Sequence, residues 1–94
     1  MSTQELCAKA IVKWGAEAQL LMVAEECSEL AVEALHYARG RGDVNHVAEE
    51  IADVELMIEQ LRMMLRGVDE DFDGLVREWK LTKWQRLACA LEAQ

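Results

Sequence analysis

The sequence predicts an all-α protein, an antiparallel bundle of about four helices that is completed by homo-oligomerisation. Proline is absent, and the five glycines fall between or at the edges of segments whose apolar residues recur with a helical period. A chain of 94 residues forms one small domain at most, which we take as residues 1–94. Hydrophobic residues make up 52% of it, more than one small core easily buries. We therefore expect a homodimer or homotetramer whose subunits share apolar faces.

The first predicted helix is short and runs to about Lys13. Ser2 or Thr3 can cap its amino end through a side-chain oxygen. Trp14 and Gly15 then interrupt the apolar pattern. The residues predicted to face inward are Leu6, Ala10 and Ile11.

Two longer helices follow on either side of a short connection that contains glycine. The second helix is predicted over residues 16–39, and Gly40 ends it. Asp43 or Asn45 can cap the third helix, which Gly67 ends. The second helix has an inward stripe of Leu20, Val23, Cys27, Leu30 and Ala34. The third has a coiled-coil-like seam of Val47, Ile51, Val54, Ile58, Leu61 and Leu65.

A fourth helix is predicted near the carboxyl end of the chain. Four acidic residues precede it or occupy its first turn, where the helix dipole favours negative charge; they are Asp69, Glu70, Asp71 and Asp73. Gly74 leaves the first residue of this helix open. Its apolar residues are Leu75, Trp79, Leu81, Trp84, Leu87, Ala88 and Leu91, and its interleaved basic residues are Arg77, Lys80, Lys83 and Arg86.

Charge and cysteine content limit the classes of function. The formal charge of -8 argues against unaided binding to nucleic acid or to an anionic membrane. No stretch reaches the roughly 18 apolar residues of a membrane span, and the first residues lack the basic segment and apolar run that are typical of an export signal, so we expect neither membrane insertion nor export. The three cysteines, Cys7, Cys27 and Cys89, form no C-x-x-C pair, and we interpret them as small core residues. These features predict a cytoplasmic protein.

Two acidic clusters lie within the second and third predicted helices. They are E-E-C-S-E at residues 25–29 and E-E-I-A-D at residues 49–53. Residues three apart project from one side of a helix, so Glu26 points with Glu29, and Glu50 points with Asp53. Antiparallel packing of the two helices can bring both pairs to one place.

Four converging carboxylates would repel one another and take up protons unless a cation neutralised them. Their oxygen atoms are the ligands that magnesium prefers, and magnesium commonly bridges protein carboxylates to substrate phosphates. We therefore predict a divalent-metal site formed by Glu26, Glu29, Glu50 and Asp53. The alternative is a solvated acidic surface, which is the usual meaning of a lone E-x-x-E.

Two other kinds of function remain open. Glu33 and His36 form an E-x-x-H, which carboxylate-bridged di-iron bundles use twice, and a homodimer would supply the second copy. Against this, His36 lies near a helix end. A helical assembly or regulatory module without catalysis is the third possibility.

The acidic pattern resembles a known family of enzymes. E-E-x-x-E followed by E-x-x-D, with Trp14, Gly15 and Gln19 ahead of the first cluster, is similar to the all-α nucleoside triphosphate pyrophosphohydrolases. That group contains MazG, the dimeric dUTPases and phosphoribosyl-ATP pyrophosphohydrolase, and small MazG-like proteins match best. The resemblance covers roughly residues 14–65. It implies magnesium ligation by the four carboxylates, with manganese as a substitute, and cleavage of a nucleoside triphosphate to monophosphate and pyrophosphate. It also implies assembly into dimers or tetramers.

Five further residues are candidates for the reaction. Glu25 can orient the attacking water or hold a second ion, or it can remain in solvent. Trp14 can stack on a base and Gln19 can hydrogen-bond a base or sugar, although a structural role is open for each. Lys80 and Lys83 can reach the phosphates, or they can pair with surface carboxylates.

Overall fold

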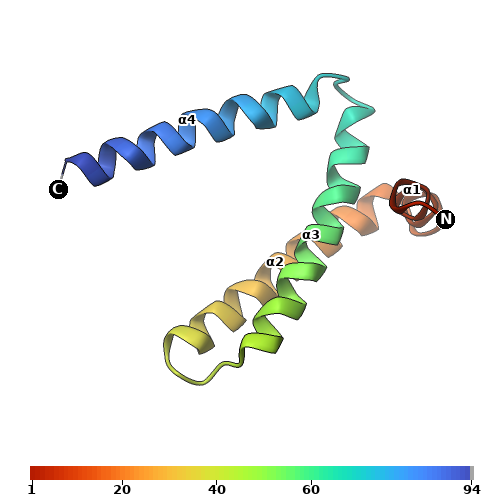
Figure 1. Cartoon of the computed structure of the whole chain (residues 1–94). Helices are drawn as coiled ribbons and strands as arrows, with labels where there is room; N and C mark the ends of the chain where they lie inside the picture. The colour runs from red at the N-terminus through yellow and green to blue at the C-terminus, as the bar shows by residue number, and fades with distance from the viewer. Residues whose placement is uncertain (94) are drawn as a thin grey trace. The chain divides into compact units, whose positions relative to one another are not determined.

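The computed structural model describes residues 1–93, which form four helices and no strand (Figure 1). The helices are α1 (Thr3–Trp14), α2 (Ala16–Ala38), α3 (Val44–Arg66) and α4 (Phe72–Glu92). The predicted all-α class is confirmed. The chain divides into two compact units, Met1–Met64 and the part from Leu65 onward. Completion of the bundle by homo-oligomerisation stays a prediction.

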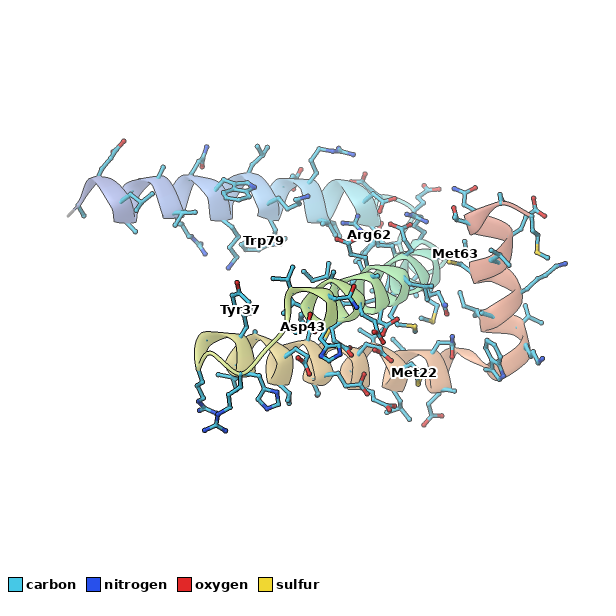
Figure 2. All side chains as sticks on the ribbon, turned by 60° about the horizontal axis from the view of Figure 1, so that its bottom comes forward. Met22, Tyr37, Asp43, Arg62, Met63 and Trp79 are labelled. Atoms are coloured by element: carbon cyan, nitrogen blue, oxygen red, sulfur yellow. The ribbon has the colours of Figure 1, made fainter. Side chains whose placement is uncertain are left out.

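The start and end of α1 follow the predicted signals. Ser2 is the capping residue, because its Oγ accepts a hydrogen bond of 3.1 Å from the Glu5 amide. At the other end, the Gly15 amide donates to the Ile11 carbonyl over 2.8 Å. Gly15 has a φ of 91°, a backbone angle that residues other than glycine rarely adopt. The helix is therefore interrupted at Gly15, and α1 lies at a steep angle to α2 (Figure 2).

The turn after α2 is a Schellman motif centred on Gly40. Gly40 has a φ of 74°, and its amide donates to the Tyr37 carbonyl over 3.0 Å. The Arg41 amide reaches back to the His36 carbonyl over 2.9 Å. Two residues after Gly40, an added Cβ on Gly42 would lie 2.8 Å from the Tyr37 amide nitrogen. The chain thus folds back tightly, as the sequence predicts.

Helices α2 and α3 form an antiparallel hairpin, in which they lie side by side (Figures 1 and 2). Asp43 begins α3 by accepting a hydrogen bond of 2.6 Å from the Asn45 amide. Far from this turn, Gln19 Nε2 donates to Gln60 Oε1 over 2.5 Å, and both side chains are buried. This bond fixes the register of the hairpin, since Gln19 lies opposite Gln60.

The register can be followed along the hairpin in helical steps of three and four residues. It places Met22 opposite Met57, and then the acidic pair of α2 opposite that of α3. Met57 is the one buried apolar residue among those described, with 5% of its surface exposed. The residues through which α2 and α3 face each other, here called the facing row, are therefore mostly polar. They are Gln19, Met22, Glu26, Glu29, Glu50, Asp53, Met57 and Gln60.

This facing row corrects the predicted inward stripes. In both helices, the predicted stripe lies one position after the facing row along the chain. One position corresponds to about 100° round the helix. Leu20 and Ile51, predicted to be inward, are 45% and 42% exposed, and Cys27 is also exposed. Leu6 and Ala34 are exposed as well. For the residues of α2 and α3, the physical reason is that the polar row occupies the contact between the two helices, so the apolar residues lie beside this contact. Leu6 belongs to α1 and lies outside it.

The two predicted stripes lie on one side of the hairpin, and together they are here called the apolar face. Because α2 and α3 are antiparallel, the residues that follow the facing row in the two helices point to the same side of the hairpin. The apolar face comprises Leu20, Val23, Cys27, Leu30 and Ala34 from α2 and Val47, Ile51, Val54, Ile58 and Leu61 from α3. Several of these side chains are half-buried in the single chain, and the others are exposed.

The second unit contains the end of α3, a short turn and α4. The Arg66 guanidinium contacts the Asp73 carboxylate through Nε and Oδ2, 2.6 Å apart, and through Nη2 and Oδ1, 3.4 Å apart. Gly74 is buried in the first turn of α4, where an added Cβ would meet the Asp71 carboxylate. Most of α4 is exposed, including Cys89, so Cys89 is not the core residue that the sequence suggested. None of the helices in the described part is long and apolar enough to cross a membrane.

Candidate metal centre

The structure brings the four predicted carboxylates together. Each offers one oxygen atom, and these four atoms all lie within 4.8 Å of one another. Glu26, Glu50 and Asp53 are partly buried, and Glu29 is exposed. We call this group the acidic cluster. Its role as a set of metal ligands stays a prediction.

The convergence follows from two local features of the hairpin. Within each helix, a spacing of three residues places both acids on one side. Between the helices, the Gln19–Gln60 register sets Glu26 opposite Asp53 and Glu29 opposite Glu50. The acidic cluster is therefore part of the facing row, two helical turns from the glutamine pair.

Two oxygen atoms of the acidic cluster are buried without any partner. Glu26 Oε2 and Glu50 Oε2 lack both solvent exposure and a hydrogen bond. Burial raises the pKa of both carboxyls above the ordinary value of 4.5, and the negative charges of Glu29 and Asp53 raise it further. Every contribution acts in the same direction. The site therefore disfavours its own negative charge unless a cation or a proton is present.

Glu25 lies beside the acidic cluster rather than within it. It is exposed, as is Glu49 on α3. Each precedes a cluster residue by one position, so the two lie on the side of the hairpin opposite to the apolar face. Glu25 is thus accessible to water next to the cluster, and a catalytic role for it stays a prediction.

Trp14 and Gln19 lie near each other at the far end of the hairpin. Both line a cavity of about 570 Å³, together with Ala18, Leu21, Met22, Leu56, Met57 and Gln60. Trp14 is 59% exposed, whereas Gln19 is 5% exposed. The structure adds Gln60, which sequence reasoning missed. Gln60 follows Asp53 by seven residues, just as Gln19 precedes Glu26 by seven, and this symmetry was the available signal.

The two predicted lysines belong to the second unit. Lys80 and Lys83 line a surface hollow on α4 with Phe72, Leu75, Val76, Trp79 and Trp84. Lys83 Nζ lies 5.8 Å from the centre of the Trp79 ring, within the range of a cation–π contact. Their contact with phosphates stays a prediction.

The four side chains of the acidic cluster offer only oxygen atoms as donors. His36 Nδ1 lies 3.9 Å from Glu33 Oε1, which is the E-x-x-H pair of the sequence. Neither this histidine nor His46 belongs to the acidic cluster. Carboxylate oxygens alone suit hard cations such as magnesium or manganese, whereas an imidazole ligand is typical of softer transition metals.

Comparison with family models, with curated proteins and with solved structures finds no match for this chain. Membership of the MazG-like family therefore remains an interpretation of the residues themselves.

Proposed function

We propose that this protein hydrolyses a nucleoside or deoxynucleoside triphosphate to the monophosphate and pyrophosphate, with magnesium bound at the acidic cluster. The observation that carries the proposal is the pair of buried carboxylate oxygens without partners, on Glu26 and Glu50, inside a group of four converging acids. The resemblance of the acidic pattern to MazG-like enzymes supports the same reaction. Removal of unwanted nucleotides from the cellular pool is the role that we propose for it in the cytoplasm.

The acidic cluster fits a divalent cation in charge and in donor type. Its four carboxylates supply hard oxygen donors, and their mutual repulsion falls when a positive ion lies among them. Magnesium, or manganese in its place, would supply polarisation of a phosphoryl oxygen and a lowered pKa for bound water. The ligands in this proposal are Glu26, Glu29, Glu50 and Asp53.

The other predicted residues have distinct parts in this proposal. Glu25, exposed beside the acidic cluster, accepts a hydrogen bond from the attacking water and so orients it. Lys80 and Lys83 offset the outer phosphate charge of the substrate. Trp14 and Gln19 contact the base or sugar, two turns along the hairpin from the carboxylates.

Homo-oligomerisation is part of the same proposal. Met57 is the one buried apolar residue in the described chain, while the apolar face extends along both helices of the hairpin. A second copy of the hairpin, packed on the apolar face, would complete a four-helix bundle and leave the side with Glu25 open. We propose a homodimer or a homotetramer.

A non-catalytic helical assembly is the second candidate, and one observation favours it. Many large apolar side chains on α4 are exposed, among them Leu81, Trp84 and Leu91, as expected of a helix that binds partners. This candidate predicts no effect of magnesium and nucleotide on the melting temperature. A ligand that binds only the folded state must raise it.

The test of the proposed function is a panel of standard and modified nucleoside triphosphates, incubated with magnesium or manganese. Separation of the products identifies the anhydride that is cut. We expect monophosphate and pyrophosphate from at least one nucleotide. Release of orthophosphate alone, or no turnover across the panel, would contradict the proposal. Iron content and visible absorption of the purified protein distinguish the di-iron alternative.

A further inference from the structure

The cavity at the end of the hairpin has the size and lining of a small-molecule site. It has a volume of about 570 Å³, within the range of roughly 300–1,000 Å³ that is usual for ligand pockets. Trp14 comes from α1, Leu21 and Met22 from α2, and Leu56 and Met57 from α3. Its walls are thus apolar and include an aromatic ring that is largely exposed.

Two buried amides give this apolar cavity a polar component. Gln19 and Gln60 are 5% and 4% exposed, and they share one hydrogen bond. The second polar atom of each amide, Gln19 Oε1 and Gln60 Nε2, makes no hydrogen bond. Neither amide atom is among the fully buried unpaired atoms, which belong to Glu26 and Glu50, so each keeps a small contact with solvent.

The open atoms offer one acceptor and one donor. If both amides are flipped about their terminal bonds, the roles of the two residues exchange, and one donor and one acceptor still remain. A nucleobase presents a donor next to an acceptor on its pairing edge, while its ring has apolar faces. The glutamine pair together with Trp14 matches both properties.

The cavity and the acidic cluster are correctly placed to hold two parts of one molecule. Gln19 and Glu26 lie on the same side of α2 and are separated by two turns, or about 10 Å along the axis. This spacing is comparable to the span from the α-phosphate to the base of an extended nucleotide. Leu21, Leu56 and Glu25 share the side of the hairpin opposite to the apolar face, so the cavity opens on the side where Glu25 is exposed.

We propose that this cavity binds the base of the substrate nucleotide and that Gln60 hydrogen-bonds its edge. The inference rests on the proposed function, since it places the base of the same molecule whose phosphates bind at the acidic cluster. Gln19 holds the Gln60 amide in position and presents the second polar atom. The ring of Trp14 stacks on the base. Gln60 is thus a specificity-determining residue.

The decisive experiment compares two substrates that differ only in the base. They are a nucleoside triphosphate and ribose 5-triphosphate, which has the same sugar and phosphates but no base. Gln60→Met keeps the length of the side chain and removes its polar atoms. We expect the KM for the nucleotide to rise about tenfold, the effect of losing a hydrogen bond to the base, with little change for ribose 5-triphosphate. Calorimetric titration with the nucleoside monophosphate should show a matching loss of affinity, independent of turnover.

Two further variants guard against effects on folding. Gln19→Met with Gln60→Met leaves no unpaired amide and places two apolar side chains beside Met22 and Met57, which line the same cavity. It should show the same loss of base discrimination as Gln60→Met. Gln85→Met, an exposed site on α4, is the matched control and should leave both KM values unchanged.

Each outcome has one meaning. Equal changes in KM for the two substrates, or no change for either, would overturn the base pocket. Altered subunit association with both KM values unchanged would assign the cavity to a contact between copies of the chain, and would also overturn it. Failure of the wild-type protein to hydrolyse any nucleotide contradicts the proposed function itself.

Discussion

At the scale of single residues, the fold holds the four carboxylates of the acidic cluster close together although their negative charges repel one another. Glu26 and Glu50 each bury one oxygen that has no partner, next to the carboxylates of Glu29 and Asp53. Natural proteins rarely leave buried polar atoms unpaired, because each costs free energy. Such an arrangement is explained when the residues serve a ligand rather than the stability of the fold.

Loss of one cluster carboxylate should abolish the activity. We expect Glu50→Gln or Asp53→Asn to stop magnesium-dependent release of pyrophosphate, because each removes a negative charge from the proposed metal site and nearly preserves the shape of the side chain. Helicity, measured by circular dichroism, should be unchanged. Glu49→Gln is the matched control, since Glu49 is an exposed neighbour outside the acidic cluster. Near wild-type rates in both cluster variants would remove the metal site from the account.

The metal-free protein should become less stable as the pH rises from about 4.5. The pKa of Glu26 and of Glu50 is raised in the folded chain, so between 4.5 and the raised values the folded state binds more protons than the unfolded state. Stability therefore falls as the pH increases through this window. Thermal unfolding with a chelator, compared with the Glu26→Gln and Glu50→Gln double variant, isolates the effect. A variant that loses apo stability at neutral pH would show that these groups are paired structurally.

Part of the site could be predicted from sequence, and the reason lies in its spacing. Residues three apart on a helix must point the same way, so the two acidic pairs were identifiable without coordinates. Gln60 was not identified, because its seven-residue spacing from Asp53 gains meaning only once the register of the hairpin places it opposite Gln19. The Gln19–Gln60 hydrogen bond defines the register of α2 against α3.

At the scale of helices, the glycine positions predicted where helices end, whereas apolar periodicity predicted the stripes but not their contacts. Gly15 and Gly40 end α1 and α2 through positive φ, as their places in the sequence suggested. Periodicity identified the apolar stripes of α2 and α3, but it does not say what a stripe contacts. The polar row one position before each stripe forms the actual α2–α3 contact.

The turn between α2 and α3 should depend on Gly40. Gly40→Ala places a Cβ in the left-handed region and should lower the free energy of unfolding by about 1–2 kcal/mol. Gly40→Asn should cost less, because asparagine tolerates this conformation better. Denaturant unfolding of the two variants measures the difference. Equal stability of the alanine variant and wild type would mean that the turn relaxes to another conformation.

At the scale of the whole molecule, the single chain has too small an interior to account for its composition. Hydrophobic residues form 52% of the sequence, yet Met57 is the one such residue that is buried in the described part. Sequence composition could indicate shared surfaces, but it could not give the number of subunits, because that depends on the shape of the apolar face.

Association should depend on the apolar face of the hairpin. We expect the wild-type mass in solution to be a multiple of 10.7 kDa, and Ile51→Lys to weaken association at least tenfold by placing a charge in the contact. Val32→Lys is the matched control, since Val32 is an exposed apolar residue on the opposite side of α2. Light scattering over a concentration series distinguishes the three proteins. A monomeric wild type would contradict this part of the account.

Direct titration with magnesium or manganese tests whether the acidic cluster binds a divalent cation. Calorimetry on the chelator-treated protein should detect binding to the wild type and to Glu49→Gln, with loss of that binding in Glu50→Gln. Equal binding by Glu50→Gln and the wild type, or no binding by the wild type, would contradict the proposed metal site.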